Sequence, residues 1–158
     1  MHFRTDLILA SQSPRRKTLL EQLGLSFRIE INPAEEIVPE GASPASIVQT
    51  LALEKAEPIS RLYPSALTLA ADTIVVHKGK VLGKPGDEAD ARAMLRRLSG
   101  DTHTVFTGLA LVHPESLRRI TAFEATQVTF DHLSEEEIRA YVASGAPMDK
   151  AGAYGIQA

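Results

Sequence analysis

The sequence of 158 residues contains no cysteine. This absence excludes disulfide bonds, thiolate metal sites and cysteine nucleophiles, and it fits the reducing cytoplasm, where we expect the protein to act. Long apolar runs are missing as well. The run near the N-terminus, Leu7 to Ala10, is too short for the apolar core of a signal peptide, and no run approaches the ~18 residues of a membrane span. We therefore expect no association with a membrane.

A strong charge of either sign is also absent, because the formal net charge is -3. The chain as a whole has no attraction for polyanions, so we expect no nucleic-acid partner, and local cations must bind any phosphate group. The sequence has neither GxxxxGK[ST] nor GxGxxG. Its histidines lack HxH or HxxxH spacing, which disfavours a zinc site, and we expect His103 to be an ordinary strand residue.

The patterns that are present indicate a single α/β domain over residues 1–158. The apolar content of 44% and the charged content of 23% are ordinary for a globular protein. Strand-like segments are Asp6–Ala10, Ser26–Ile31, Leu67–Val76, Val81–Leu82, Thr102–Val112 and Ile120–Phe130. Helices are expected after the caps Ser13, Ser43, Asp87 and Ser134, and Pro58 is expected to end or kink the second of them. The order of these segments predicts a mixed sheet with helices on its faces.

The predicted start of the first helix carries three cations, Arg15, Arg16 and Lys17. Cations at the positive end of a helix are unfavourable by about 0.3–1 kcal/mol each, so removal of Arg16 is expected to stabilise the helix slightly. A bound phosphate would reverse that sign, and the hydroxyls of Ser11 and Ser13 would add donors to it. This segment therefore predicts a phosphate site. The alternative is that the three cations simply extend into solvent.

A second candidate site contains Asp72, which lies inside the apolar segment AADTIVV. Because burial of an unpaired charge is costly, this carboxylate should be paired, bound to a metal or at a functional edge of the sheet. The alternative is a strand-end aspartate that accepts hydrogen bonds from backbone amides. Glu35 and Glu36 lie in a loop, where carboxylates are usually only solvated, but with Asp72 they could form an all-oxygen site for Mg²⁺ or Mn²⁺. Lys55 and Lys84, each taken alone, are more typical of surface lysines.

Seven segments together resemble the Maf family, the septum-formation-inhibitor-like nucleotide pyrophosphatases. They are LILASQSPRR, the Glu35-Glu36 loop, LALEKA, AADTIVV, LGKP, LRRLSGDTHTVFTG and DKAGAYGIQ, and they occur in the family's order along nearly the whole chain. The resemblance implies an α/β fold with a deep cleft, related to the inosine triphosphate pyrophosphatases. It also implies hydrolysis of a nucleoside triphosphate substrate to the monophosphate and pyrophosphate, dependent on a divalent cation, as a house-cleaning activity.

The resemblance implies roles for particular residues of this sequence. Asp72 corresponds to the proton acceptor, and Glu36 and Lys84 complete the expected catalytic set, with Glu36 and Asp72 as metal ligands. The residues expected to bind substrate are Ser11, Ser13, Arg15, Arg16, Lys55, Thr73 and Gln157. Among them, Arg15, Thr73 and Gln157 correspond to positions tied to the choice of substrate.

The form SPRR with DKAGAYGIQ resembles the dTTP/UTP branch of the family, with modified pyrimidine nucleotides as a further substrate class. Two alternatives stay open at this point. One is 7-methyl-GTP hydrolysis, and the other is a nucleotide-binding regulator of cell division without turnover. Family members continue past GIQ with a strand and a final helix, whereas this sequence stops at Ala158. We therefore expect the domain to lack that C-terminal segment. A homodimer is an open expectation.

Overall fold

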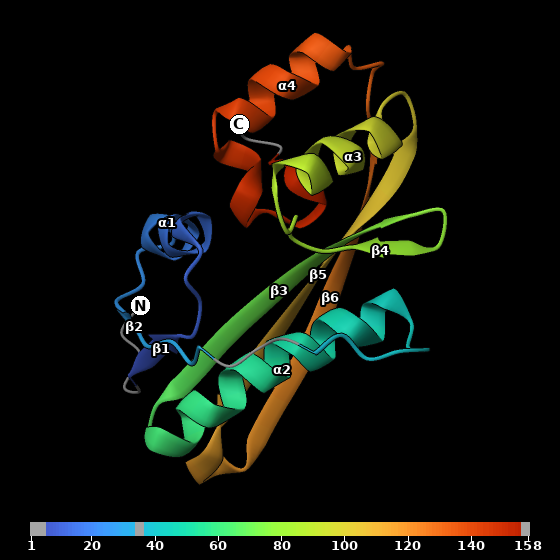
Figure 1. Cartoon of the computed structure of the whole chain (residues 1–158). Helices are drawn as coiled ribbons and strands as arrows, with labels where there is room; N and C mark the ends of the chain where they lie inside the picture. The colour runs from blue at the N-terminus through green and yellow to red at the C-terminus, as the bar shows by residue number, and fades with distance from the viewer. Residues whose placement is uncertain (1–5, 34–36, 156–158) are drawn as a thin grey trace. The chain divides into compact units, whose positions relative to one another are not determined.

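The computed structural model describes residues 6–33 and 37–155. Strands and helices alternate in the first half of the chain, and two long strands follow one another in the second half (Figure 1). The elements are β1 (Leu7–Leu9), α1 (Pro14–Gln22), β2 (Arg28–Ile29), α2 (Pro44–Leu62), β3 (Leu67–His77), β4 (Lys80–Leu82), α3 (Glu88–Leu98), β5 (Thr102–His113), η1 (Pro114–Ser116), β6 (Arg118–Thr129), α4 (Glu135–Ala143), η2 (Ala146–Asp149) and η3 (Ala151–Ala153).

The strands of the described residues form one mixed sheet in the order β2-β1-β3-β5-β6, with β4 paired to β3. Strand β1 runs parallel to both of its neighbours, and β4 runs antiparallel to β3. The turn between β3 and β4 consists of Lys78 and Gly79, with φ of 48° and 77°. Positive φ at both central residues is the type I′ geometry that suits a two-residue hairpin. The predicted hairpin and the mixed α/β fold are confirmed.

All four predicted helix caps are confirmed. The side chains of Ser13, Ser43, Asp87 and Ser134 each accept a hydrogen bond from the backbone N–H three residues on, and Ser134 forms a capping box with Glu137. The prediction for Pro58 was less accurate, because α2 continues beyond it to Leu62. Pro58 leaves the carbonyl of Glu54 without its helical donor. Glu54 is exposed, so water can solvate that carbonyl, while the following residues Ile59 and Ser60 are buried and keep the last turn in place.

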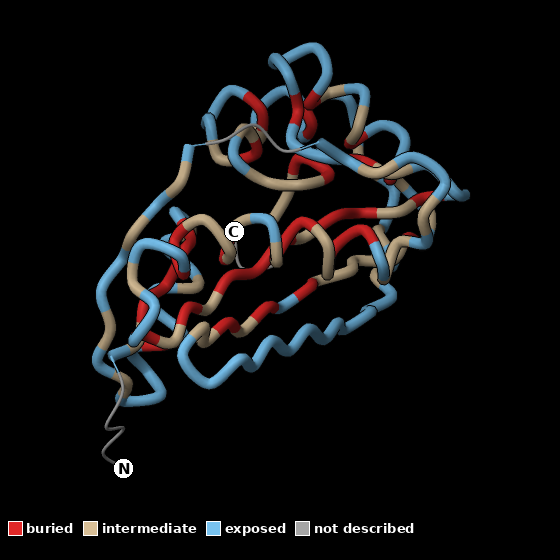
Figure 2. Tube along the Cα trace, turned by 90° about the horizontal axis from the view of Figure 1, so that it is seen from below, coloured by how far each residue is buried: buried red, intermediate tan, exposed pale blue. Residues whose placement is uncertain are grey.

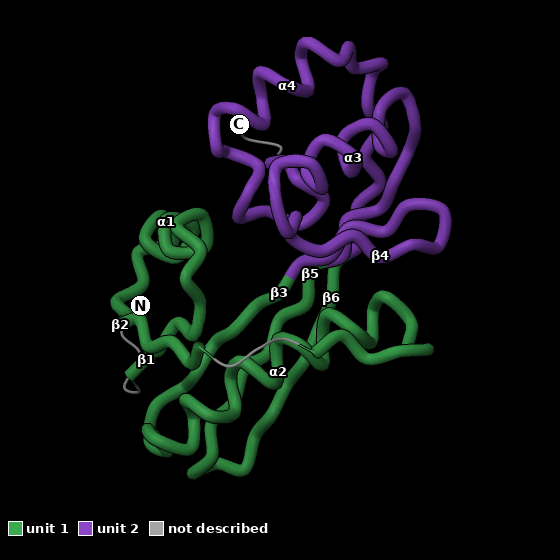
Figure 3. Tube along the Cα trace, in the orientation of Figure 1, with its two compact units in different colours: residues 1–72, 107–124 green, residues 73–106, 125–158 purple. Residues whose placement is uncertain are grey.

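The chain divides into two compact units, coloured separately in Figure 3. Unit 1 contains residues 1–72 and 107–124, and unit 2 contains residues 73–106 and 125–158, so β3, β5 and β6 each contribute to both. The expectation of a single family domain over residues 1–158 stays a prediction.

The core of unit 1 forms where α2 packs on the sheet. Its buried residues come from β1, α2, β3 and β5 and include many alanines: Ile8, Ala10, Ala52, Ala56, Ile59, Ala66, Ala70, Ala110 and Val112. Small side chains let the helix approach the strands closely. At the nearest point Gly108 of β5 faces the backbone of α2, where an added Cβ would lie 2.3 Å from the carbonyl oxygen of Val48. A glycine is therefore required at that position.

The core of unit 2 is helical on one side and strand-based on the other. Helices α3 and α4 pack together with η3 through Ala91, Leu95, Ile138, Val142 and Ala153. A second cluster joins Val75 of β3, Leu82 of β4 and Leu98 of α3. These contacts place the segment that follows α4 against the hairpin of β3 and β4.

Strand β6 is exposed along almost its whole length, whereas β3 is mostly buried or half-buried (Figure 2). This contrast follows from the strand order, because β3 lies inside the sheet and β6 lies at its end. Within residues 6–33 and 37–155 we find no helix long and apolar enough to cross a membrane.

Candidate active site

The turn from β1 into α1 is organised by the hydroxyls of Ser11 and Ser13, both in unit 1. Ser11 Oγ accepts a hydrogen bond from the backbone N–H of Ser13 at 3.2 Å, and Ser13 Oγ accepts one from the N–H of Arg16 at 3.3 Å. The Arg16 side chain turns back over this turn and donates from Nη1 to Ser11 Oγ at 3.2 Å and to the carbonyl oxygen of Ala71 at 3.1 Å. Arg16 thereby joins the start of α1 to β3.

The acceptor on β3 is available because β1 leaves the sheet just before it. The last backbone hydrogen bond between the two strands runs from Ala10 N to Leu69 O, at 2.8 Å. Beyond this point the chain turns away into α1, so the carbonyl of Ala71 has no partner from β1. A buried or partly buried carbonyl needs a donor. The guanidinium of Arg16 supplies it.

The three cations at the start of α1 have different surroundings. Lys17 Nζ lies 3.8 Å from the carboxylate of Glu21 one helical turn later, and the side chain of Arg15 is exposed. Arg16 is half-buried and bound to two oxygens, so the alternative that all three extend into solvent is wrong for Arg16. The expectation that Arg16 weakens this end of the helix is revised in the Discussion on the basis of these contacts.

Asp72 follows Ala71 directly on β3 and is only 7% exposed. Its Oδ1 lies 3.4 Å from Nζ of Lys55, which reaches it from α2 in the same unit. The prediction that this carboxylate is paired is confirmed. Lys55 is more buried than a typical surface lysine, with 26% of its side chain exposed. The attraction of the ammonium group offsets part of the cost of removing the carboxylate from water.

Unit 1 therefore brings together five of the predicted site residues, Ser11, Ser13, Arg16, Lys55 and Asp72. Of the others, Arg15 is exposed on α1, and Glu36 and Gln157 lie outside the described residues, as does Glu35. Thr73 and Lys84 belong to unit 2. Thr73 is half-buried on β3, and Lys84 is exposed in the loop after β4.

Among the described residues, no group of three or more histidine, cysteine, aspartate or glutamate side chains comes together to hold a metal ion. Asp72 is the one predicted metal ligand within residues 6–33 and 37–155, and it offers carboxylate oxygens. Mg²⁺ is commonly held by one or two carboxylates together with substrate phosphates. The chemistry of this donor fits such an ion.

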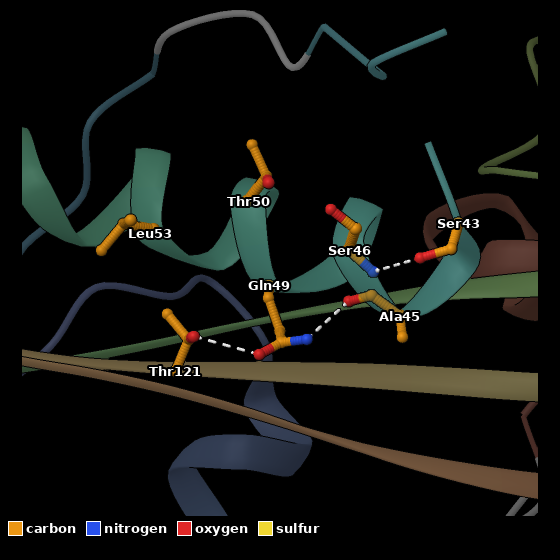
Figure 4. Close-up of a pocket in the computed structure, with 7 residues that line it drawn as sticks. All are labelled: Ser43, Ala45, Ser46, Gln49, Thr50, Leu53 and Thr121. Carbon is orange, nitrogen blue, oxygen red and sulfur yellow. Dashed lines mark hydrogen bonds between the residues drawn. The ribbon is translucent and has the colours of Figure 1, made fainter. Parts of the chain in front are cut away.

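A separate pocket of about 360 Å³ lies between the start of α2 and β6 in unit 1 (Figure 4). Its lining residues are Ser43, Ala45, Ser46, Gln49, Thr50, Leu53 and Thr121, and no predicted site residue is among them. Gln49 uses its side-chain amide internally, donating to the carbonyl of Ala45 at 3.0 Å and accepting from the Thr121 hydroxyl at 3.0 Å. This pocket is not the candidate active site.

Sequence reasoning missed a cluster of polar rings in unit 2. His103 is buried on β5, and its Nε2 lies 2.5 Å from the hydroxyl of Tyr154. Burial lowers the pKa of His103, with a further lowering by His77 and an opposing effect of Asp101, and burial raises the pKa of Tyr154 to about 12. A histidine inside a strand and a tyrosine in a glycine-rich segment 51 residues later were the available sequence signals, but nothing in the sequence joins them.

A second pair lies beside this cluster. His77 is buried at the end of β3, and its Nε2 lies 2.9 Å from Oδ2 of Asp101. Lys78 Nζ lies 3.4 Å from the same carboxylate oxygen. The hydrogen bond with His77 is the main cause that lowers the pKa of Asp101 to about 2, with the backbone N–H of Thr102 next.

Comparison with known proteins places these observations in a family. A family model described as "Maf-like protein" matches residues 6–158. A Salinibacter ruber protein named "dTTP/UTP pyrophosphatase" is 54% identical over 151 residues, covering 96% of this chain and 74% of the relative. A Pelotomaculum thermopropionicum protein of the same name is 49% identical, covering 96% of this chain and 80% of the relative.

Among solved structures, the Staphylococcus aureus Ham1 protein superposes with a TM-score of 0.53 at 11% identity, covering 78% of this chain and 70% of that one. At so low an identity this likeness concerns the fold alone, and it agrees with the mixed α/β sheet. The sequence matches are far closer and extend over nearly the whole chain. On these grounds, the chain belongs to the Maf family.

Proposed function

We propose that this chain is a nucleoside triphosphate pyrophosphatase that hydrolyses dTTP and UTP to the monophosphate and pyrophosphate. The observation that carries the proposal is the buried carboxylate of Asp72, which follows Ala71, the residue whose carbonyl binds Arg16. A protein that only binds phosphate gains nothing from a carboxylate beside its cations, whereas hydrolysis needs a group that accepts a proton. The names of the relatives at 54% and 49% identity support the same activity.

The phosphates bind at the start of α1. A helix N-terminus offers backbone N–H groups and a positive dipole, and Ser11 and Ser13 place hydroxyls beside it. The Arg16 guanidinium is a planar donor that suits phosphate oxygens. On binding, the triphosphate brings the negative charge that three cations at this end of the helix otherwise lack. Lys84 binds the same phosphates in this proposal, and Arg15 contributes from the exposed face.

The reaction is attack of water on the phosphorus between the ester oxygen and the departing pyrophosphate. Asp72 takes the proton of the attacking water, and Lys55 holds the carboxylate in position through the contact at 3.4 Å. As the bond to the β-phosphate breaks, charge grows on the departing pyrophosphate. Arg16, Lys84 and the N–H groups of α1 stabilise that charge.

A divalent cation, Mg²⁺ or Mn²⁺, is part of the proposal, with Asp72 and Glu36 as its protein ligands. When bound, such an ion lowers the pKa of a coordinated water and neutralises phosphate charge. Activity that disappears with a chelator and returns with either metal supports this part. Gln157 and Thr73 read the pyrimidine base, with Arg15 assisting. A cytoplasmic location and a homodimer stay predictions.

The test measures pyrophosphate release from dTTP, UTP, CTP and 7-methyl-GTP at equal concentration. The wild-type chain should prefer dTTP and UTP, and faster hydrolysis of 7-methyl-GTP would overturn the choice of substrate. Asp72→Asn keeps the shape of the side chain and removes its basicity, so turnover should fall about 10²–10⁴-fold while nucleotide still binds. Asp6→Asn, an exposed carboxylate of unit 1, is the matched control and should retain full activity.

A further inference from the structure

The segment 150–155 is fixed in unit 2 at two points. At the first, Gly152 N donates a hydrogen bond to the carbonyl oxygen of Gly83 at 3.0 Å. Gly152 has a φ of 70°, and a Cβ there would lie 2.8 Å from a methyl group of Val75. The backbone of this segment therefore lies directly against the end of the hairpin of β3 and β4, and Gly83 is the residue that precedes Lys84.

At the second point, Tyr154 joins a cluster of three rings. The ring centroids of His103 and Tyr154 are 5.3 Å apart, those of His103 and Phe130 are 4.9 Å apart, and those of Phe130 and Tyr154 are 4.7 Å apart, all with edge-to-face geometry. Within this apolar cluster, the hydrogen bond between His103 Nε2 and the Tyr154 hydroxyl is a polar contact between β5 and the segment 150–155. Its burial makes its loss costly.

We infer that His103 is a positioning residue for the reaction: through Tyr154 it holds the segment 150–155 in place, and that segment fixes Gly83 and the loop that carries Lys84. The inference rests on the proposed function, because it assigns Lys84 to the bound phosphates. Gln157, proposed to read the base, follows Tyr154 by three residues in the sequence. One hydrogen bond thus bears on two substrate-binding residues that are far apart in the sequence.

The pairing requires a neutral imidazole. Nδ1 of His103 is buried and has no hydrogen-bond partner among the described residues, so a proton added there would carry charge into an apolar cluster. The charged and titratable groups around the ring are His77, which opposes its protonation, Asp101, which favours it, and Tyr154. Tyr154 stays neutral throughout the working range, since its pKa is about 12. Acid should therefore loosen the segment through His103.

The experiment compares four variants by their kcat and KM for dTTP. His103→Phe keeps the ring packing and removes the hydrogen bond, and Tyr154→Phe removes a single oxygen. His103→Gln places an amide nitrogen near the position of Nε2, so it keeps a partner for Tyr154 but cannot titrate. Tyr63→Phe, a tyrosine of unit 1 whose ring lies under Arg28 at 4.4 Å, is the matched control.

The first two variants should each raise KM about 3- to 10-fold at pH 8, the loss expected for one hydrogen bond. Combining them should be no worse than the more damaging single change, since both remove the same contact. His103→Gln should stay near the wild-type KM. As pH falls below 6.5, the ordinary histidine value, kcat/KM of the wild type should decrease more steeply than that of His103→Gln.

Two results would overturn the inference while leaving the proposed function intact. One is active wild-type protein with KM and kcat unchanged within twofold in both His103→Phe and Tyr154→Phe. The other is independent effects that multiply in the double variant. If the wild-type chain releases no pyrophosphate from any triphosphate, the proposed function fails, and this inference fails with it.

Discussion

Replacing Arg16 by alanine tests whether its side chain is held mainly as a ligand for phosphate or also as part of the fold. The helix dipole alone predicts that the change stabilises the protein by about 0.3–1 kcal/mol. The structure adds two hydrogen bonds from the guanidinium, to Ser11 Oγ and to Ala71 O. Bonds from a charged donor contribute about 1.5–3 kcal/mol each when buried, and less here because Arg16 is half-buried. The net expectation is a loss of about 1–2 kcal/mol.

Arg15→Ala is the matched control, because Arg15 lies in the same helical turn and is exposed. It should leave stability unchanged or raise it by a few tenths of a kcal/mol, as expected for the dipole effect alone. Thermal unfolding followed by circular dichroism separates the two variants. For a chain of about 150 residues, 1 kcal/mol corresponds to about 2–4 °C, so Arg16→Ala should unfold about 2–8 °C below the wild type.

The same two variants test phosphate binding. Saturating dTTP should raise the unfolding temperature of the wild type, and this shift should be smaller in Arg16→Ala than in Arg15→Ala. Two observations would refute the reasoning. An Arg16→Ala protein at least as stable as Arg15→Ala would show that the contacts with Ser11 and Ala71 contribute nothing to the fold. An equal shift by dTTP in wild type and Arg16→Ala would remove Arg16 from the phosphate site.

Two further predictions concern the fold. Gly108→Ala should destabilise the protein by about 3 kcal/mol or more, because the new Cβ would lie 2.3 Å from the carbonyl oxygen of Val48, whereas Gly86→Ala, with its nearest contact at 3.9 Å, should be tolerated. Denaturation midpoints should fall as pH drops from 3.8, the ordinary pKa of Asp101, towards its folded value of about 2, because the ionised carboxylate is stabilised by His77 in the folded state. Asp101→Asn should flatten this part of the profile, and an unchanged profile would contradict the pairing.

Local chemistry made most of the fold predictable. Each helix start was visible as a short polar residue followed by a proline or an acidic turn, and these caps depend on atoms no more than three residues away. The hairpin at Lys78-Gly79 depends on two adjacent residues in the same way. Pro58 was the exception, because whether a helix survives a proline depends on the burial of the turn that follows, which is a tertiary property.

The candidate site was predictable in its residue types and not in its contacts. Asp72 could be expected to have a partner because a buried carboxylate is costly, but the sequence does not say that the partner is Lys55 rather than backbone amides or a metal. The pairing of His103 with Tyr154 spans 51 residues and has no local signal. Contacts of this length are decided by how strands are ordered in the sheet.

The contact of Arg16 with Ala71 shows how strand order produces the site. Parallel strands β1 and β3 stay paired through Leu9 and Leu69, and Ala10 N makes their last hydrogen bond. Where the strands separate, β3 presents a carbonyl without a strand partner and, one residue later, a carboxylate. Such openings at the carboxyl ends of parallel strands are where α/β proteins commonly bind ligands. Arg16 satisfies the carbonyl, and its position beside Asp72 follows from that, because the two acceptors are consecutive residues of one strand. The cation placed at the unfavourable end of α1 is thus explained by the backbone it completes as well as by the phosphate proposed to bind beside it.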